Sequence, residues 1–330
     1  MSIQKFARMF RHLQMLPVLE SGEETLVGGQ AVMEGVMMRA PHSYCVAVRK
    51  PNGEIVTDEQ PVAKLSDKYP IFRLPMFRGV GTLGQAMSLG VKALQFSANA
   101  AIDDQRAEQA AKAKPAPEFS KAMMTASLVF SMVFFIVLYK LAPLGITRLL
   151  EERYPAIQGQ LASNFVDGVV RIAIFLGFMF AISRFKDIHR VFQYHGAEHK
   201  VVFNFESGQP VNVENAQRFS TLHPRCGTSF LLVVMVISML VYMALPFEGF
   251  AARFAARILL LPVIAGLSYE VIRYAARKRG SLLALLTAPG LWLQRITTQT
   301  PTDDMTGIAI HALEGAMALE KKQGGALVIA

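Results

Sequence analysis

The sequence is poor in cysteine, with only Cys45 and Cys226 in 330 residues. The two lie far apart in the chain and give no disulfide framework of the kind that stabilises small secreted domains. The basic start of the chain, with Lys5, Arg8 and Arg11, is not followed by a long apolar run. We therefore expect no cleavable signal peptide.

Nucleotide-binding loops are also missing. The glycines between Val27 and Arg39 fit neither the GxGxxG pattern nor the P-loop. No aromatic side chains alternate with basic ones in a way that would form a platform for RNA or DNA. The net charge of +9 therefore does not predict a nucleic-acid partner. In an apolar chain, a basic excess more often marks the cytoplasmic flanks of membrane spans.

Apolar residues are abundant, at 52% of the chain, and the mean hydropathy is +0.32. This is too apolar for an ordinary soluble domain and indicates several membrane spans. Four segments have few charges and lengths suitable for crossing a membrane: 122–139, 168–183, 228–247 and 254–272. A further segment, 281–294, is free of charge but short, and we interpret it as a re-entrant or interfacial hairpin.

The expected fold is an α-helical integral membrane protein of about four transmembrane helices, with a small cytosolic α+β N-terminal part. Asn52-Gly53 between two alternating segments predicts a β-hairpin there. Lysine and arginine are concentrated in connections that place both termini in the cytosol. The expected regions are an amphipathic arm (1–25), a cytosolic α+β region with hairpin and linker (26–119), a four-span domain (120–280) containing a cytosolic metal-site loop (186–227), and an interfacial hairpin with a C-terminal helix (281–330).

The most informative motif runs from His195 to His199 and reads H-x-x-E-H. On a helix, His195, Glu198 and His199 share one face. Two neutral imidazoles can bind a transition metal, and the carboxylate can bind it too or act as general base toward a metal-bound water. The spelling is that of the inverzincins. We predict a divalent transition metal, with zinc expected, and Glu198 as the catalytic residue. The alternative is a polar loop with hydrogen-bonded histidines.

The third metal ligand is expected from one of three residues. His223 and Cys226 follow the motif in a predicted tight turn. Glu270 lies within the fourth expected span, near its cytosolic end, where an acid is costly and indicates a functional site. The alternative for Glu270 is an ion pair with Arg273 or Arg171.

Glu34 and Arg39 are the two charges in an otherwise apolar run, 27–39. One interpretation places both residues behind the metal ligands, with Glu34 reaching the metal site or orienting a ligand side chain. The other, which we favour for Glu34, is a buried turn and strand in which Glu34 caps or pairs.

Several stretches together resemble the YqhQ-like family of bacterial integral membrane proteins. They are residues 28–39, 194–200 and 223–230, with Ser268-Tyr269-Glu270. The resemblance covers roughly residues 25–310. That family is described as a domain of unknown function and a predicted metal-dependent enzyme. The resemblance implies a multi-pass protein of the bacterial cytoplasmic (inner) membrane, with the lipid bilayer as a partner, and it names no substrate.

The leading hypothesis is a metal-dependent hydrolase at the cytosol–membrane boundary, acting on a membrane peptide or a lipid head group. The alternative is a non-catalytic membrane scaffold or assembly factor with a structural metal site. A closed set of His195, His199, His223 and Cys226 favours the structural role, whereas an open position beside Glu198 favours catalysis. A transporter is a weaker third hypothesis because no inverted repeat is visible.

Overall fold

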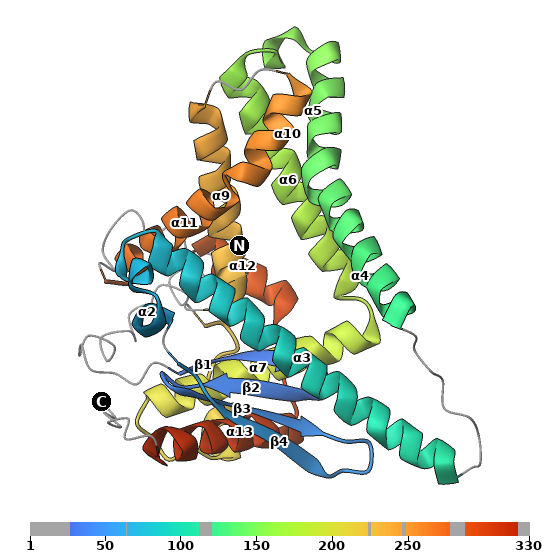
Figure 1. The fold of residues 1–330 in the computed structure, drawn as a ribbon, viewed down its shortest axis with the longest axis vertical. Coiled ribbons are helices and arrows are strands. Elements are labelled where there is room, and N and C mark those ends of the chain that lie inside the picture. Colours follow the sequence, from blue (N-terminus) through green and yellow to red (C-terminus); the bar gives the residue numbers. More distant parts are fainter. Residues whose placement is uncertain are drawn as a thin grey trace.

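A computed structural model of the chain describes residues 27–63, 65–111, 121–223, 226–245, 249–277 and 288–322. A small body of sheet and helices carries an elongated bundle of apolar helices (Figure 1). The expected amphipathic arm (1–25) lies outside the described residues. So do residues 112–119 of the expected linker and 281–287 of the expected interfacial hairpin.

The sheet is a four-stranded antiparallel meander in which every strand pairs with the next along the chain. The turn before the last strand holds Gly53 at a φ of +89°, and the Asn52 side chain accepts a hydrogen bond from the Glu54 amide. The hairpin predicted from Asn52-Gly53 is therefore confirmed. The strands are β1 (Gly28–Val32), β2 (Gly35–Arg39), β3 (Ser43–Arg49) and β4 (Ile55–Pro61).

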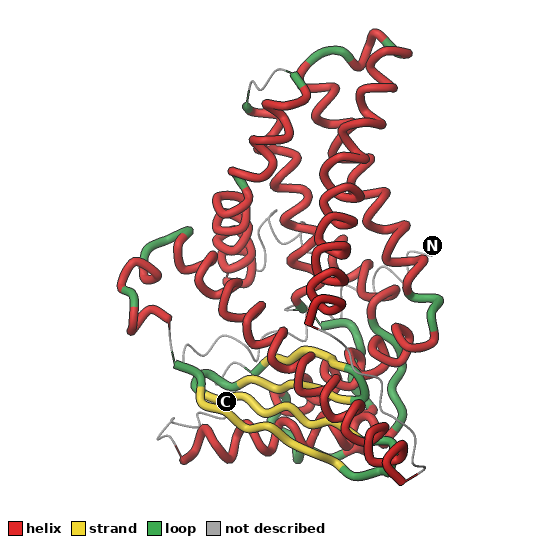
Figure 2. Tube along the Cα trace, turned by 45° about the vertical axis from the view of Figure 1, so that its right-hand side comes forward, coloured by secondary structure: helices red, strands yellow, loops and turns green. Residues whose placement is uncertain are grey.

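The sheet forms the middle layer of the body (Figures 1 and 2). Successive side chains of a strand point to opposite faces, so each face of β2 and β3 buries a different helical layer. One face, including Met38 and Cys45, packs on α7 (Lys186–Glu206) and α13 (Asp303–Lys322). The other, including Met37 and Val46, packs on α3 (Phe77–Ala111). The body therefore contains helices from three distant parts of the chain and extends beyond residues 26–119.

Helix α3 lies against the sheet and does not run with the bundle (Figure 1). Leu89 and Ala93 are buried beneath the sheet. Met87, Val91 and Leu94 form a second apolar face and are exposed. The short helices α2 (Leu65–Lys68) and η2 (Pro70–Arg73) precede α3.

The expected C-terminal amphipathic helix is α13, and its apolar residues Ile308 and Leu313 are buried against the sheet. Its first turn contains Asp303 and Asp304, but neither is the cap. The Thr302 hydroxyl accepts a hydrogen bond from the Met305 amide at 3.4 Å. Thr302 therefore caps the start of α13, a position at which threonine is one of the preferred residues.

Three described helices are long and apolar enough to cross a membrane, or four if a bent pair is counted as one span. The first candidate runs over Val129–Arg153, further along the chain than the expected 122–139. The bent pair turns by 53°. The bundle elements are α4 (Lys121–Ile136), the π-helical η3 (Val137–Leu141), α5 (Ala142–Arg153), the 3-10 turn η4 (Pro155–Ile157), α6 (Gln160–Ile182), α9 (Gly227–Ala244), α10 (Phe250–Leu259) and α11 (Leu261–Arg277).

The bundle buries an ionic cluster in which Asp167 accepts hydrogen bonds from two arginines. Arg171 lies one turn further along the same helix, and Arg257 of α10 approaches to 2.8 Å. Both guanidinium groups also lie near the Tyr242 ring, at 5.3 and 5.8 Å from its centroid. Arg171 therefore pairs with Asp167 and not with Glu270, because three helices bring the opposite charges together inside the bundle.

Candidate metal centre

The motif histidines lie on α7, between the sheet and a segment that follows α12 (Ala288–Thr297). The Gln299 amide donates to the Phe192 carbonyl at 2.9 Å, which presses this segment against α7. Gly196 makes the approach possible, because a Cβ atom there would lie 2.0 Å from the Gln299 carbonyl oxygen. The glycine of the motif thus positions α7 so that His195 faces the end of α12.

Both motif histidines are oriented by backbone carbonyls. His195 Nδ1 lies 2.8 Å from the Thr297 carbonyl oxygen, and His199 Nδ1 is hydrogen-bonded to the Thr221 carbonyl. A carbonyl only accepts, so each Nδ1 is the protonated donor and each Nε2 presents a lone pair. Metal-binding histidines almost always have their second nitrogen fixed in this way. The local structure therefore prepares two Nε2 atoms as ligands.

Cys226 completes a group of three ligand atoms. Its Sγ lies 3.2 Å from His195 Nε2, and one ligand atom from each of His195, His199 and Cys226 lies within 4.8 Å of the others. Cys226 is the N-cap of α9, and its sulfur accepts a hydrogen bond from the Thr228 amide. The unsatisfied amides and dipole at a helix N-terminus stabilise an anionic sulfur. Of the three residues expected to supply the third ligand, Cys226 is the one that lies with both histidines.

The surroundings of His199 fit a bound cation. Its side chain is buried, and its Nε2 atom forms no hydrogen bond to any described residue. That nitrogen faces the Glu198 carboxylate, with 3.4 Å between Nε2 and Oε2. A lone pair that faces a carboxylate in a buried site is unfavourable unless a proton or a cation lies between or beside them. A cation bound at His195, His199 and Cys226 would remove that cost.

Burial also keeps the imidazoles in the form that binds metals. It is the largest cause that lowers the pKa of His199, and it outweighs the opposing effect of the Cys226 sulfur. Burial likewise lowers the pKa of His223 to about 4. Both rings are therefore neutral at physiological pH, as ligation by imidazole requires.

His223 lies beside the group but is not part of it. Its ring packs edge-on against Phe203, and its Nε2 atom lies 3.5 Å from the Glu206 carboxylate. The fully buried Gln294 of α12 binds the His223 backbone twice, accepting from its amide at 2.7 Å and donating to its carbonyl at 2.8 Å. Gln294 fixes the turn that leads to Cys226, and no motif in the sequence indicated this role.

Glu270 is not brought to the three ligand atoms. Helix α11 packs against α3, and the Glu270 carboxylate receives two hydrogen bonds from the Arg78 guanidinium. Glu270 was expected as a possible metal ligand, but its carboxylate forms an ion pair with a cation from a distant helix and lies apart from the three ligand atoms. The alternative Arg171 is not the partner, since it pairs with Asp167. The alternative Arg273 stays untested, because its side chain lies outside the described part of the structure.

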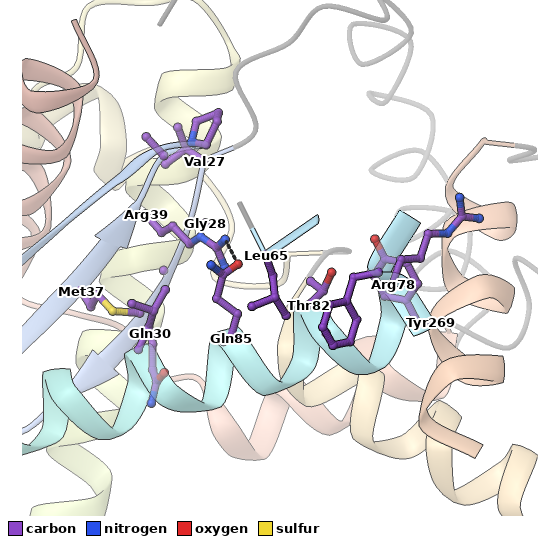
Figure 3. A pocket seen from close by; sticks show the side chains of 17 residues that line it. Val27, Gly28, Gln30, Met37, Arg39, Leu65, Arg78, Thr82, Gln85 and Tyr269 are labelled. Carbon is purple, nitrogen blue, oxygen red and sulfur yellow. Dashed lines mark hydrogen bonds between the residues drawn. The ribbon is translucent and has the colours of Figure 1, made fainter. Parts of the chain in front are cut away.

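Glu34 and Arg39 contact other groups than the ligand atoms. Glu34 occupies the turn between β1 and β2 with a φ of +53°, and it forms a two-fold ion pair with Arg190 on α7. The Tyr194 hydroxyl donates to the same carboxylate at 3.3 Å. Glu34 thus attaches α7 to the sheet one residue before His195. Arg39 lies in a cleft and donates to Gln85 at 2.9 Å (Figure 3).

Gly29 is a residue of the site that the sequence did not reveal as such. A Cβ atom at this position would lie 2.6 Å from Glu198 Cγ and 2.7 Å from the Met37 carbonyl oxygen. Only glycine leaves room for the Glu198 side chain beside β1. The signal was present as the glycine pair Gly28-Gly29, but sequence alone does not say what approaches it.

We expect Gly29→Ala to displace Glu198 and to destabilise the fold by about 1–3 kcal/mol, the usual cost of overpacking. Gly28→Ala is the matched control, because a Cβ atom there meets nothing within 4 Å. Thermal unfolding of both purified variants in the same detergent measures the difference. Equal stability of the two variants would contradict the close packing of β1 against Glu198.

Comparisons with known proteins identify a family and a relative for this chain. Residues 74–319 match a family model described as a protein of unknown function, DUF1385. An uncharacterised protein of Bacillus subtilis (strain 168), YqhQ, is 34% identical over 299 residues, which cover 89% of this chain and 92% of that protein. No solved structure gives a significant match. The match over most of the chain confirms the expected resemblance, and the protein belongs to the DUF1385 family.

Proposed function

We propose that the protein is a metal-dependent hydrolase at the boundary between the cytosol and the bacterial inner membrane, with a divalent metal, zinc by preference, bound by His195, His199 and Cys226. The observation that carries the proposal is the convergence of these three ligand atoms beside the Glu198 carboxylate. Three protein ligands with a further position open are typical of catalytic zinc, whereas structural zinc is usually held by four.

The residues of the site have separate roles in this proposal. The carbonyls of Thr221 and Thr297 hold the two imidazoles as Nε2 ligands. A divalent metal supplies Lewis acidity and makes water acidic enough to react near neutral pH. Glu198, buried and adjacent to His199 Nε2, accepts the proton of the attacking water and delivers it to the leaving group.

The surroundings of the ligands support catalysis over a purely structural metal. His223, the fourth residue of a closed set, is turned toward Phe203 and Glu206. His195 is only partly buried, which supports access to the ligand group from one side. Cys226 starts one of the candidate spans, which supports placing the chemistry at the membrane surface. If no reaction is found, the alternative of a non-catalytic scaffold with a structural metal would be favoured.

The proposed orientation places the sheet body and both termini in the cytosol. It is supported by the basic residues that follow the second and fourth candidate spans, such as Arg184, Lys186 and Arg277. A reporter fused after Lys200 should then be active only on the cytosolic side. Reporter activity on the outer side would show that the protein has the opposite orientation.

Transfer of oxygen from water tests the reaction directly. The purified protein is incubated in ¹⁸O-labelled water with a lipid and peptide extract of bacterial membranes, with and without prior removal of metal by a chelator. We expect labelled products only from the metal-loaded protein, because hydrolysis places a water oxygen in one product. Absence of label in every lipid and peptide fraction would contradict the proposal.

A further inference from the structure

A second site lies on the other side of Gly29 from Glu198. It is an open cleft of about 740 Å³ between the sheet and α3, with Tyr269 of α11 at its far end (Figure 3). Gly29 belongs to its lining and also contacts the position of the Glu198 side chain. One glycine backbone therefore separates the cleft from the carboxylate of the candidate metal centre.

The charged residues that line the cleft are all positive. Among its seventeen described lining residues are two arginines, Arg39 and Arg78, and no carboxylate. Arg78 is neutralised by Glu270, which lies outside the lining. Arg39 forms no ion pair with any described residue and donates only to the neutral Gln85. Burial lowers the pKa of Arg39, which reflects the cost of keeping this cation away from water. An anion in the cleft would offset that cost.

The remaining walls of the cleft are largely apolar, with Leu65, Phe72 and Leu89 among them. The same segment of the chain exposes large apolar side chains beside the opening: Tyr69, Ile71, Leu74, Met76 and Phe77 are each more than a third exposed. Basic residues Lys68 and Arg73 are interspersed with them. Exposed apolar side chains mixed with basic ones are typical of a segment that lies in the surface of an anionic membrane.

From this arrangement we infer that the cleft binds the headgroup of an anionic phospholipid, with Arg39 on the phosphate and the acyl chains leaving past residues 69–77. The guanidinium group presents several donors in the geometry that phosphate oxygens accept. The inference rests on the proposed function in one respect: it selects the lipid head group as the substrate class, because the cleft would hold an anionic phospholipid at the same body that carries the candidate metal centre.

The test is a titration of the purified full-length chain in a neutral detergent, read by native mass spectrometry. The probes are phosphatidylglycerol and phosphatidylcholine with identical acyl chains. We expect the wild type to bind one phosphatidylglycerol at least tenfold more tightly than phosphatidylcholine. Arg39→Gln should abolish the preference. Arg49→Gln, with the same loss of charge at a surface position that pairs with Asp304, should keep it.

A second variant guards against a folding defect in Arg39→Gln. Ala86 is exposed and lines the cleft, so Ala86→Phe fills the space while both arginines stay. It should reduce binding of phosphatidylglycerol at least tenfold without changing thermal stability. Equal binding of both lipids by the wild type, or an unchanged preference in the folded Arg39→Gln and Ala86→Phe variants, would overturn the inference. So would full competition by water-soluble glycerophosphoglycerol at the same concentration, because the lipid chains would then contribute nothing.

Metal content separates this inference from the proposed function. Neither Arg39 nor Ala86 belongs to the ligand group, so both variants should retain metal. A protein that prefers phosphatidylglycerol but holds no metal would retain the lipid site and lose the proposed reaction. A metal-loaded, active protein without the preference would lose only the lipid site.

Discussion

Glu198→Gln should retain the bound metal and the fold while the hydrolytic rate falls by ~10²–10⁴-fold, the usual cost of removing a positioned general base. The glutamine side chain preserves the shape that fits beside Gly29 but cannot accept the proton. The reaction is followed by ¹⁸O transfer from water, with metal content and thermal stability measured on the same preparation.

Glu214→Gln is the matched control for this variant. Glu214 is an exposed carboxylate on the short helix α8 (Val213–Gln217) and pairs with Arg218 at the surface. Its removal should leave activity and metal content unchanged. Full activity of Glu198→Gln would eliminate Glu198 as the base. Loss of metal in Glu198→Gln would instead make this residue a fourth ligand and favour the structural interpretation of the site.

The second large effect concerns the metal itself. His199→Ala and Cys226→Ser should each lower metal affinity by more than the ~10–100-fold that follows loss of an outer hydrogen-bond partner, because each removes a direct ligand. A serine hydroxyl is a poor replacement for a thiolate on zinc. The measurement is the ratio of metal to protein after dialysis against a weak chelator, by elemental analysis.

One histidine and one cysteine elsewhere in the chain serve as controls. His311 is exposed on α13, and His311→Ala should keep the metal. Cys45 is buried in β3, and burial raises the pKa of its thiol to about 12, so we expect it to stay protonated and not to compete for the metal. Cys45→Ala should therefore lose stability but not metal. If Cys226→Ser retains the metal and His223→Ala loses it, the ligand assignment is wrong.

The sequence predicted the part of the site that local periodicity determines. His195, Glu198 and His199 share one face because the helix repeat requires it, and α7 is observed there. The choice among Cys226, His223 and Glu270 was not predictable in this way. Cys226 and His223 are three residues apart in a turn, and only the start of α9 and the clamp by Gln294 separate their roles.

Long-range contacts account for the rest of the difference. Glu270 pairs with Arg78, 192 residues away, and no local pattern links the two. Glu34 reaches Arg190 across a similar separation, so its charge attaches α7 to the sheet and does not approach the ligand atoms. The hairpin at Asn52-Gly53 and the apolar helices were readable from alternation, turn residues and hydropathy. The packing of α7 and α13 on one face of the sheet was not, because it joins segments more than 100 residues apart.

X-ray absorption of the metal-loaded protein tests the central claim most directly, because it reports the atoms around the ion without knowledge of the substrate. For zinc we predict one sulfur at about 2.3 Å, two imidazole nitrogens at about 2.0–2.1 Å and a further light atom from water or a carboxylate. The sulfur signal should vanish in Cys226→Ser. A wild-type spectrum with three imidazoles and one sulfur would show a closed structural site that includes His223, and a spectrum without sulfur would contradict the assignment of Cys226.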